Sequence, residues 1–119
     1  MKIIIPISVG ELLDKISILS IKSQHTNNEY VKKELQDLIQ IAKEHQVYDT
    51  SYVSQLLTIN RKLWKIEDDL RFLEKSNTFN QDFIKLARSV YITNDERSKI
   101  KKEINEKYNS DYQEVKCYG

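Results

Sequence analysis

The sequence predicts an all-α protein, an antiparallel bundle of four main helices, and three observations support this fold class. Apolar residues recur at intervals of three and four along most of the 119 residues, as they do on one face of a helix. Only two glycines and one proline interrupt the chain, so we expect few and long elements. Polar stretches with helix-capping residues separate the apolar patterns. We expect one domain over residues 1–119, with helices at about 9–23, 28–45, 51–75 and 80–108.

The first predicted helix begins after a capping box, because the Ser8 side chain can accept a hydrogen bond from the backbone N–H of Glu11. Before it, Lys2 to Ile7 is expected to be extended, since consecutive isoleucines are β-branched and Pro6 biases Ile5 away from the helical region. Two alternatives stay open for the ends of the chain. Either Lys2 to Ile5 pairs as a short β-strand with residues 111–119, or the tail is partly disordered.

The third predicted helix organises the bundle, because it carries two parallel stripes at helical spacing. One stripe is apolar and runs from Tyr52 to Leu73, which predicts packing against the first and fourth helices. Glu67 and Arg71 stand at i,i+4 spacing in the second stripe, so they can pair with each other while Trp64 covers their stems. We favour a structural network here over a ligand site.

The fourth predicted helix has a polar step in its apolar stripe, at Thr93 and Arg97. One account is a single helix to about Tyr108. The other is a break just before Thr93, because Thr93-x-x-Glu96 forms a capping box. We favour the continuous helix, since the apolar spacing continues beyond the polar step.

An arginine in an apolar seam needs a carboxylate or a bound anion, which indicates a polar cluster between the first, third and fourth helices. We expect Arg97 to pair with Glu67 or Glu11. We also expect Glu67 and Arg71 to face Arg97 and the 11–15 region across this cluster. The candidate site residues are Glu11, Asp14, Lys15, Asn60, Trp64, Glu67, Arg71, Arg88, Tyr91, Asn94 and Arg97.

Composition narrows the classes of function. The net charge is +1 and the charges are interleaved, so we expect neither a nucleic-acid nor a membrane partner. A single cysteine, Cys117, fits a reducing compartment, and we expect a cytoplasmic protein. No metal site is expected, because Glu11-x-x-Asp14 has no clean counterpart and the histidines lack partners at ligand spacing. The sequence indicates no particular cofactor.

Three blocks of the chain combine polar residues with apolar seams. They are Val9-Gly-Glu-Leu-Leu-Asp-Lys-Ile-Ser-Ile-Leu19, Asn60-x-x-Leu-Trp-x-Ile-Glu-Asp-x-x-Arg71 and Ala87-Arg-Ser-Val-Tyr-x-x-Asn-Asp-x-Arg97. With them the chain resembles, over nearly its whole length, an uncharacterised family of small bacterial and phage proteins. The resemblance implies no activity, because that family is a domain of unknown function.

Two hypotheses about function follow from these patterns. The first is a non-enzymatic helical interaction or scaffold module, with a homodimer as one form. The alternative is a small enzyme or binding protein for an anionic metabolite, such as a nucleotide or sugar phosphate. In that case Arg71, Arg88 and Arg97 would hold the anion, with a carboxylate from the cluster on a metal ion or acting as a base. A closed and paired cluster favours the module, whereas an open cleft with unpaired arginines favours the metabolite.

Overall fold

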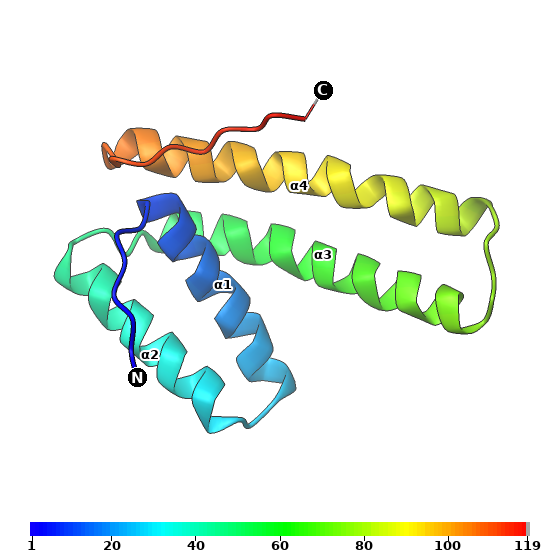
Figure 1. The fold of residues 1–119 in the computed structure, drawn as a ribbon, viewed down its shortest axis with the longest axis horizontal. Helices are drawn as coiled ribbons and strands as arrows, with labels where there is room; N and C mark the ends of the chain where they lie inside the picture. Colours follow the sequence, from blue (N-terminus) through cyan, green and yellow to red (C-terminus); the bar gives the residue numbers. More distant parts are fainter. Residues whose placement is uncertain (119) are drawn as a thin grey trace.

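The computed structural model describes residues 1–118, and the helices within them confirm the predicted all-α class (Figure 1). The ends of the helices lie within two residues of the expected positions. α4 is continuous through Thr93, as we favoured. The helices are α1 (Val9–His25), α2 (Glu29–Glu44), α3 (Thr50–Lys75) and α4 (Gln81–Lys107).

Each helix begins at a residue whose side chain accepts a hydrogen bond from a free backbone N–H of the first turn. These residues are Ser8, Asn28, Asp49 and Asn80. Three helices are followed by a residue with positive φ, a conformation in which asparagine costs little. These residues are Gln46 after α2, Asn77 after α3 and Asn109 after α4. Local sequence therefore determines where the helices start and stop.

The long helices α3 and α4 form an antiparallel hairpin, and α1 lies across one end of it (Figure 1). Helix α1 contacts all three other helices, whereas α2 approaches only α1. The hairpin end that carries the α3–α4 turn extends beyond α1 and α2, and we call it the distal end. Among the described helices, α1 is therefore the one that packs against all the others.

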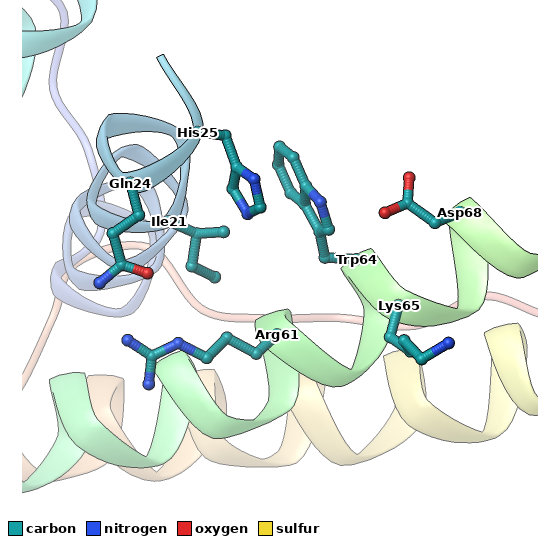
Figure 2. Close-up of a pocket in the computed structure, with 7 residues that line it drawn as sticks. All are labelled: Ile21, Gln24, His25, Arg61, Trp64, Lys65 and Asp68. Carbon is teal, nitrogen blue, oxygen red and sulfur yellow. The ribbon is translucent and has the colours of Figure 1, made fainter. Parts of the chain in front are cut away.

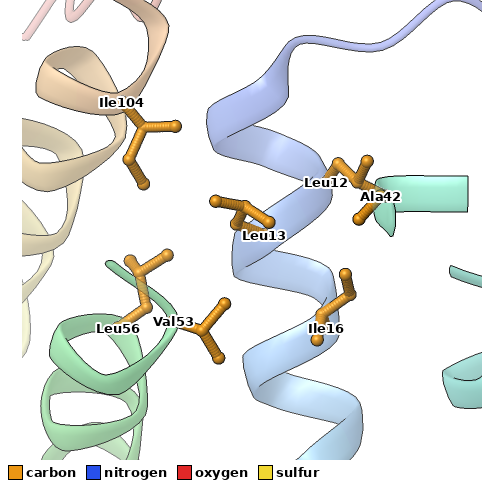
Figure 3. Packing of buried hydrophobic residues seen from close by; sticks show 7 residues of the cluster. All are labelled: Leu12, Leu13, Ile16, Ala42, Val53, Leu56 and Ile104. Carbon is orange, nitrogen blue, oxygen red and sulfur yellow. The ribbon is translucent and has the colours of Figure 1, made fainter. Parts of the chain in front are cut away.

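The apolar core lies where α1 meets the other three helices (Figure 3). Leu13 points from α1 toward α3 and α4, whereas Leu12 lies beside Ala42 of α2. Burying each large aliphatic side chain contributes about 1.5–3 kcal/mol. The buried cluster consists of Leu12, Leu13, Ile16, Ala42, Val53, Leu56 and Ile104.

Gly10 allows α1 to approach the backbone of α4 closely. Its N–H donates to Asn105 Oδ1 at 2.7 Å. A Cβ at this position would lie 2.7 Å from the Lys101 carbonyl oxygen and 2.9 Å from Asn105 Oδ1. Both distances are too short for a side chain, so the crossing of α1 and α4 requires glycine here.

Asp49 links the start of α3 to the end of α4. Its carboxylate accepts hydrogen bonds from Lys107 Nζ at 2.7 Å and from the Tyr108 hydroxyl at 2.6 Å, and it caps α3 through the Tyr52 N–H. These bonds, with the one from Lys107 first, lower the pKa of Asp49 to about 2. The charged carboxylate is therefore the form that fastens the two helix ends together.

The two ends of the chain run in different directions, so the strand pair, one of the two alternatives left open, is not formed in residues 1–118 (Figure 1). The N-terminal segment follows α2, where Lys2 Nζ lies 3.4 Å from Asp37, and the tail follows α4, where Lys116 Nζ lies 2.9 Å from Asp95 (Figure 1). Gly119, the last residue of the tail segment 111–119, lies outside the described residues. No helix in the described part of the chain has both the length and the apolar content needed to cross a membrane.

We predict that Gly10→Ala lowers the free energy of unfolding by about 1–3 kcal/mol, because the new methyl group meets the Lys101 carbonyl. Urea denaturation followed by circular dichroism measures this difference. Without the clash, alanine would instead stabilise α1 by about 1 kcal/mol through its higher helix propensity. A gain in stability would therefore contradict the close approach.

We predict that Asp49→Asn removes part of the acid sensitivity of the fold. The pKa of Asp49 is about 2 in the folded chain, and it is about 3.9 in an unfolded chain. The carboxylate therefore stabilises the fold above about pH 4, and this contribution is lost as the pH falls toward 2. Urea midpoints between about pH 2 and pH 6 should fall less steeply for the variant, in which asparagine still caps the helix. Identical slopes would contradict this role.

Candidate functional site

Asp14 of α1 is fully buried, and its carboxyl group lies at the junction of α1, α3 and α4. The Arg97 Nε donates to Asp14 Oδ1 at 3.0 Å, and the Arg97 Nη2 donates to Oδ2. From α3, Asn60 Nδ2 donates to Asp14 Oδ1 at 2.9 Å. A two-pronged arginine pair of this kind is among the strongest polar contacts in proteins. One carboxylate therefore joins three helices.

Ser17 completes the group, which we call the Asp14 cluster: Asp14, Ser17, Asn60 and Arg97. The Ser17 hydroxyl donates to the Asp14 carbonyl oxygen at 2.7 Å and accepts from Asn60 Nδ2 at 2.8 Å. On the outer side, Arg97 Nη1 donates to Asn94 Oδ1 at 3.4 Å. Both Asp14 carboxylate oxygens are thus engaged, and the buried charge has the partners that its burial demands.

Arg97 stays protonated in this setting. The hydrogen bonds to Asp14 raise the pKa of Arg97, burial opposes this, and the charges of Asp14, Glu11 and Glu114 add to the rise. Its side chain is 25% exposed, whereas that of Asp14 is 1% exposed. Since the carboxylate is closed off and already paired, this pair is suited to fixing helix positions rather than to moving protons.

A second ionic group lies beside the Asp14 cluster. Lys101 of α4 is buried, and its Nζ lies 3.3 Å from Glu11 on α1 and 3.3 Å from Glu114 in the C-terminal tail. Two carboxylates therefore balance one buried ammonium group. This contact fastens the tail to α4 next to the N-terminal turn of α1.

The structure brings together five of the candidate residues: Glu11, Asp14, Asn60, Asn94 and Arg97. Our expectation that Arg97 pairs with Glu67 or Glu11 is corrected, because its partner is Asp14. Asp14 stands three residues after Glu11, on the buried side of α1, whereas Glu67 is exposed.

The other candidates lie outside this group. Lys15 points to α2, where it lies 3.8 Å from Glu34. Glu67 and Arg71 pair with each other at 3.6 Å in solvent, as the i,i+4 spacing predicted. Arg88 and Tyr91 are exposed on α4. Trp64 is half-buried and stacks on His25.

Helical spacing explains this division. On α3, Asn60 and Glu67 are seven residues apart, so they share one side of the helix. On α4, the spacings between Ile84, Tyr91 and Asn105 are seven and fourteen residues, so these three also share one side. Asn60 and Asn105 bond to α1. Toward the distal end α1 no longer covers this side of the hairpin (Figure 1). We call the uncovered part the distal face. It consists of Glu67, Arg71, Ile84 and Tyr91, with Trp64 at its edge, where Trp64 stacks on His25 of α1.

A groove of about 370 Å³ leads from the Asp14 cluster onto the distal face. Its charged lining has two arginines and two carboxylates, so their formal charges cancel. The groove is lined by Ile18, Ile21, Asn60, Leu63, Trp64, Glu67, Asp68, Arg71 and Arg97. Among the described residues, no group of three or more His, Cys, Asp or Glu side chains could hold a metal ion.

A smaller hollow of about 270 Å³ lies between the end of α1 and α3 (Figure 2). The His25 and Trp64 rings face each other there, with centroids 4.6 Å apart and planes 11° apart. Arg61 lies on the Gln24 side of this stack. The stack fastens the last turn of α1 to α3.

The sequence prediction missed four residues of these groups: Ser17, His25, Lys101 and Glu114. Ser17 gave a usable signal, because it is a small polar residue three positions after Asp14 within a wide apolar arc. Lys101 stands four residues after Arg97 and so shares its side of α4. Nothing local identifies His25 or Glu114, since both depend on long-range packing.

The whole chain, residues 1–119, matches the protein family described as "Family of unknown function (DUF6165)", and the chain belongs to this family. No curated protein and no solved structure matches the chain significantly.

We predict that Asp14→Asn lowers the free energy of unfolding by roughly 3 kcal/mol, because the Arg97 charge loses its partner in a mostly buried position. Thermal and urea denaturation measure the effect. The matched control is Glu67→Gln, which breaks an exposed ion pair and should cost no more than about 0.5 kcal/mol. Equal losses from the two variants would show that the buried pair does not anchor the bundle.

Proposed function

We propose that this member of a family of unknown function is a non-enzymatic helical interaction module. In this proposal residues 1–119 form a single domain, which is homodimeric and binds a partner protein through the distal face. One observation carries the proposal: α1 covers only part of one side of the α3–α4 hairpin, and the rest of that side is left uncovered (Figure 1).

The Asp14 cluster supports a structural role for the polar residues under α1. Asp14 has no exposed surface, and Arg97, Asn60 and Ser17 surround it with hydrogen bonds. A general base must be able to reach the proton that it removes, and a substrate has no access to Asp14. A closed Asp14 cluster with paired charges favours an interaction module over an enzyme.

The distal face has the composition of a protein-binding surface. Trp64, Tyr91 and Arg71 are of the types that contribute most to binding energy at protein interfaces. Ile84 adds exposed apolar area, and the Glu67–Arg71 pair forms a charged edge. Exposed apolar side chains grouped on one face typically mark a place where another molecule docks.

The kind of partner follows from how α1 uses the same side of the hairpin. Helix α1 lies as a third helix on α3 and α4 and packs its apolar residues into their seam. The distal part presents the same two helices without a third. An amphipathic helix from a partner protein therefore fits it, with apolar residues inward and charges matching Glu67 and Arg71.

The alternative, an anionic metabolite in the groove, has weaker support. Arg97 is neutralised by Asp14, and Arg71 by Glu67. With Asp68 also in the lining, the groove offers a phosphate no net positive charge. Unpaired arginines, the feature that would favour this function, are not found in the groove.

We predict that a photo-crosslinking residue in place of Tyr91 captures a protein in the cells that make this chain, whereas the same residue in place of Ile92 does not. The two positions are adjacent and similarly exposed, at 55% and 46%, but they point to different sides of α4. Blotting for the chain after irradiation reveals the adducts. Arg71→Glu should remove the adducts at position 91, because it reverses a charge on the distal face.

Equal adducts at positions 91 and 92, or none at either, would count against the module. A parallel thermal-shift measurement with nucleotides and sugar phosphates tests the alternative, since a ligand that binds the folded state raises its melting temperature. A rise that Arg71→Glu abolishes would favour the metabolite.

A further inference from the structure

The N-terminal segment runs outside the helices along α2 and exposes three consecutive isoleucines (Figure 1). Ile3, Ile4 and Ile5 are 77%, 88% and 67% exposed. Consecutive side chains of an extended chain point to opposite sides, so isoleucine is exposed on both sides of this segment. We call residues 2–6 the isoleucine segment.

The backbone of this segment is also free. Across the described residues, no backbone N–H or C=O group of residues 1–7 forms a hydrogen bond within the chain. The first backbone group that does so is the Ser8 carbonyl, which accepts from the Leu12 N–H. An extended, β-branched segment with unpaired backbone groups is a template for pairing with another strand.

The order of residues suits pairing of the isoleucine segment with a copy of itself. Ile3 and Ile5 flank Ile4 symmetrically, so an antiparallel pair centred on Ile4 places Ile4 opposite its counterpart and Ile3 opposite Ile5. All four flanking isoleucines then share one face. Pro6 has no N–H and falls opposite Lys2, at the ends of the ribbon.

Helix α2 provides a support for such a ribbon. Asp37 of α2 holds the Lys2 ammonium group at 3.4 Å, so the two copies would not repel each other through unpaired lysines. Ile41 stands one turn further along α2 and is partly exposed. A two-stranded ribbon alone is marginal in water, and apolar contact with a helix makes it more stable.

We propose that the isoleucine segment is the dimer interface of this protein. Two copies of residues 2–6 pair antiparallel about a two-fold axis at Ile4, which is the closed symmetry expected of a homodimer. The inference rests on the proposed function only for the dimeric state. The segment lies by α2, away from the distal end of the hairpin, so each copy keeps its distal face free (Figure 1).

Disulfide trapping tests the pairing residue by residue. All variants carry Cys117→Ser, which removes the one exposed native thiol. Directly opposite residues have Cα atoms about 4.5–5.5 Å apart, which a disulfide can bridge, whereas positions offset by two residues are about 7–8 Å apart. Under mild oxidation, Ile4→Cys should therefore form a covalent dimer at least about tenfold faster than Ile3→Cys.

Mixed cross-linking between positions 3 and 5 tests the register of the antiparallel pair a second time. Ile3→Cys mixed with Ile5→Cys should form a mixed covalent dimer as readily as Ile4→Cys does, because these two positions are opposite each other. Sedimentation velocity supplies the non-covalent counterpart. Ile4→Lys should convert the dimer into a monomer, whereas the control Ile92→Lys, at an exposed isoleucine of α4, should leave it dimeric.

Equal cross-linking at positions 3, 4 and 5 would reflect random collision and overturn the proposal. A wild-type chain that sediments as a monomer, or a dimer that survives Ile4→Lys, would overturn it too. The two proposals fail separately. Loss of the Tyr91 adducts with an intact Ile4 disulfide would refute the distal face alone, and the reverse result would refute the strand pairing alone.

Discussion

The position of α1 depends on a carboxylate that has no contact with water. A buried carboxylate is costly without partners, and Asp14 has them in Arg97 and Asn60. These two residues lie on different helices, so a shift or rotation of α1 would break at least one of the contacts. Apolar burial stabilises the fold, but it is non-directional, whereas hydrogen bonds require particular atoms to meet. We attribute the specific register of the three helices to this polar contact.

Other contacts hold α1 on both sides of Asp14. Gly10 brings the backbones of α1 and α4 together one turn earlier, and its N–H bonds to Asn105. The ammonium group of Lys101 fastens the tail and the first turn of α1 to the same part of α4. At the other end of α1, His25 stacks on Trp64 of α3. Helix α1 is thus anchored along its length, and the hairpin beyond its end is left uncovered.

The sequence predicted much of the fold because its signals are local. Capping residues and apolar spacing determined the four helices, including the continuous path of α4 through Thr93. The site was harder to predict, since it depends on which sides of the helices meet. Asp14 was recognised as a candidate, but its pairing with Arg97 follows from the crossing of α1 and α4. Glu67 and Arg71 share the expected side of α3, yet both are exposed and pair with each other.

The attachment of α2 has a consequence for the motions of the molecule. This helix packs against α1 alone, and its outer face is polar and exposed. Parts of a protein with few packing partners open at a lower free-energy cost than the whole fold does. Helix α2 can therefore detach while α1, α3 and α4 stay assembled around Asp14. Such an opening would expose Leu12, which lies beside Ala42 of α2, while the contacts of Asp14 with α3 and α4 stay in place.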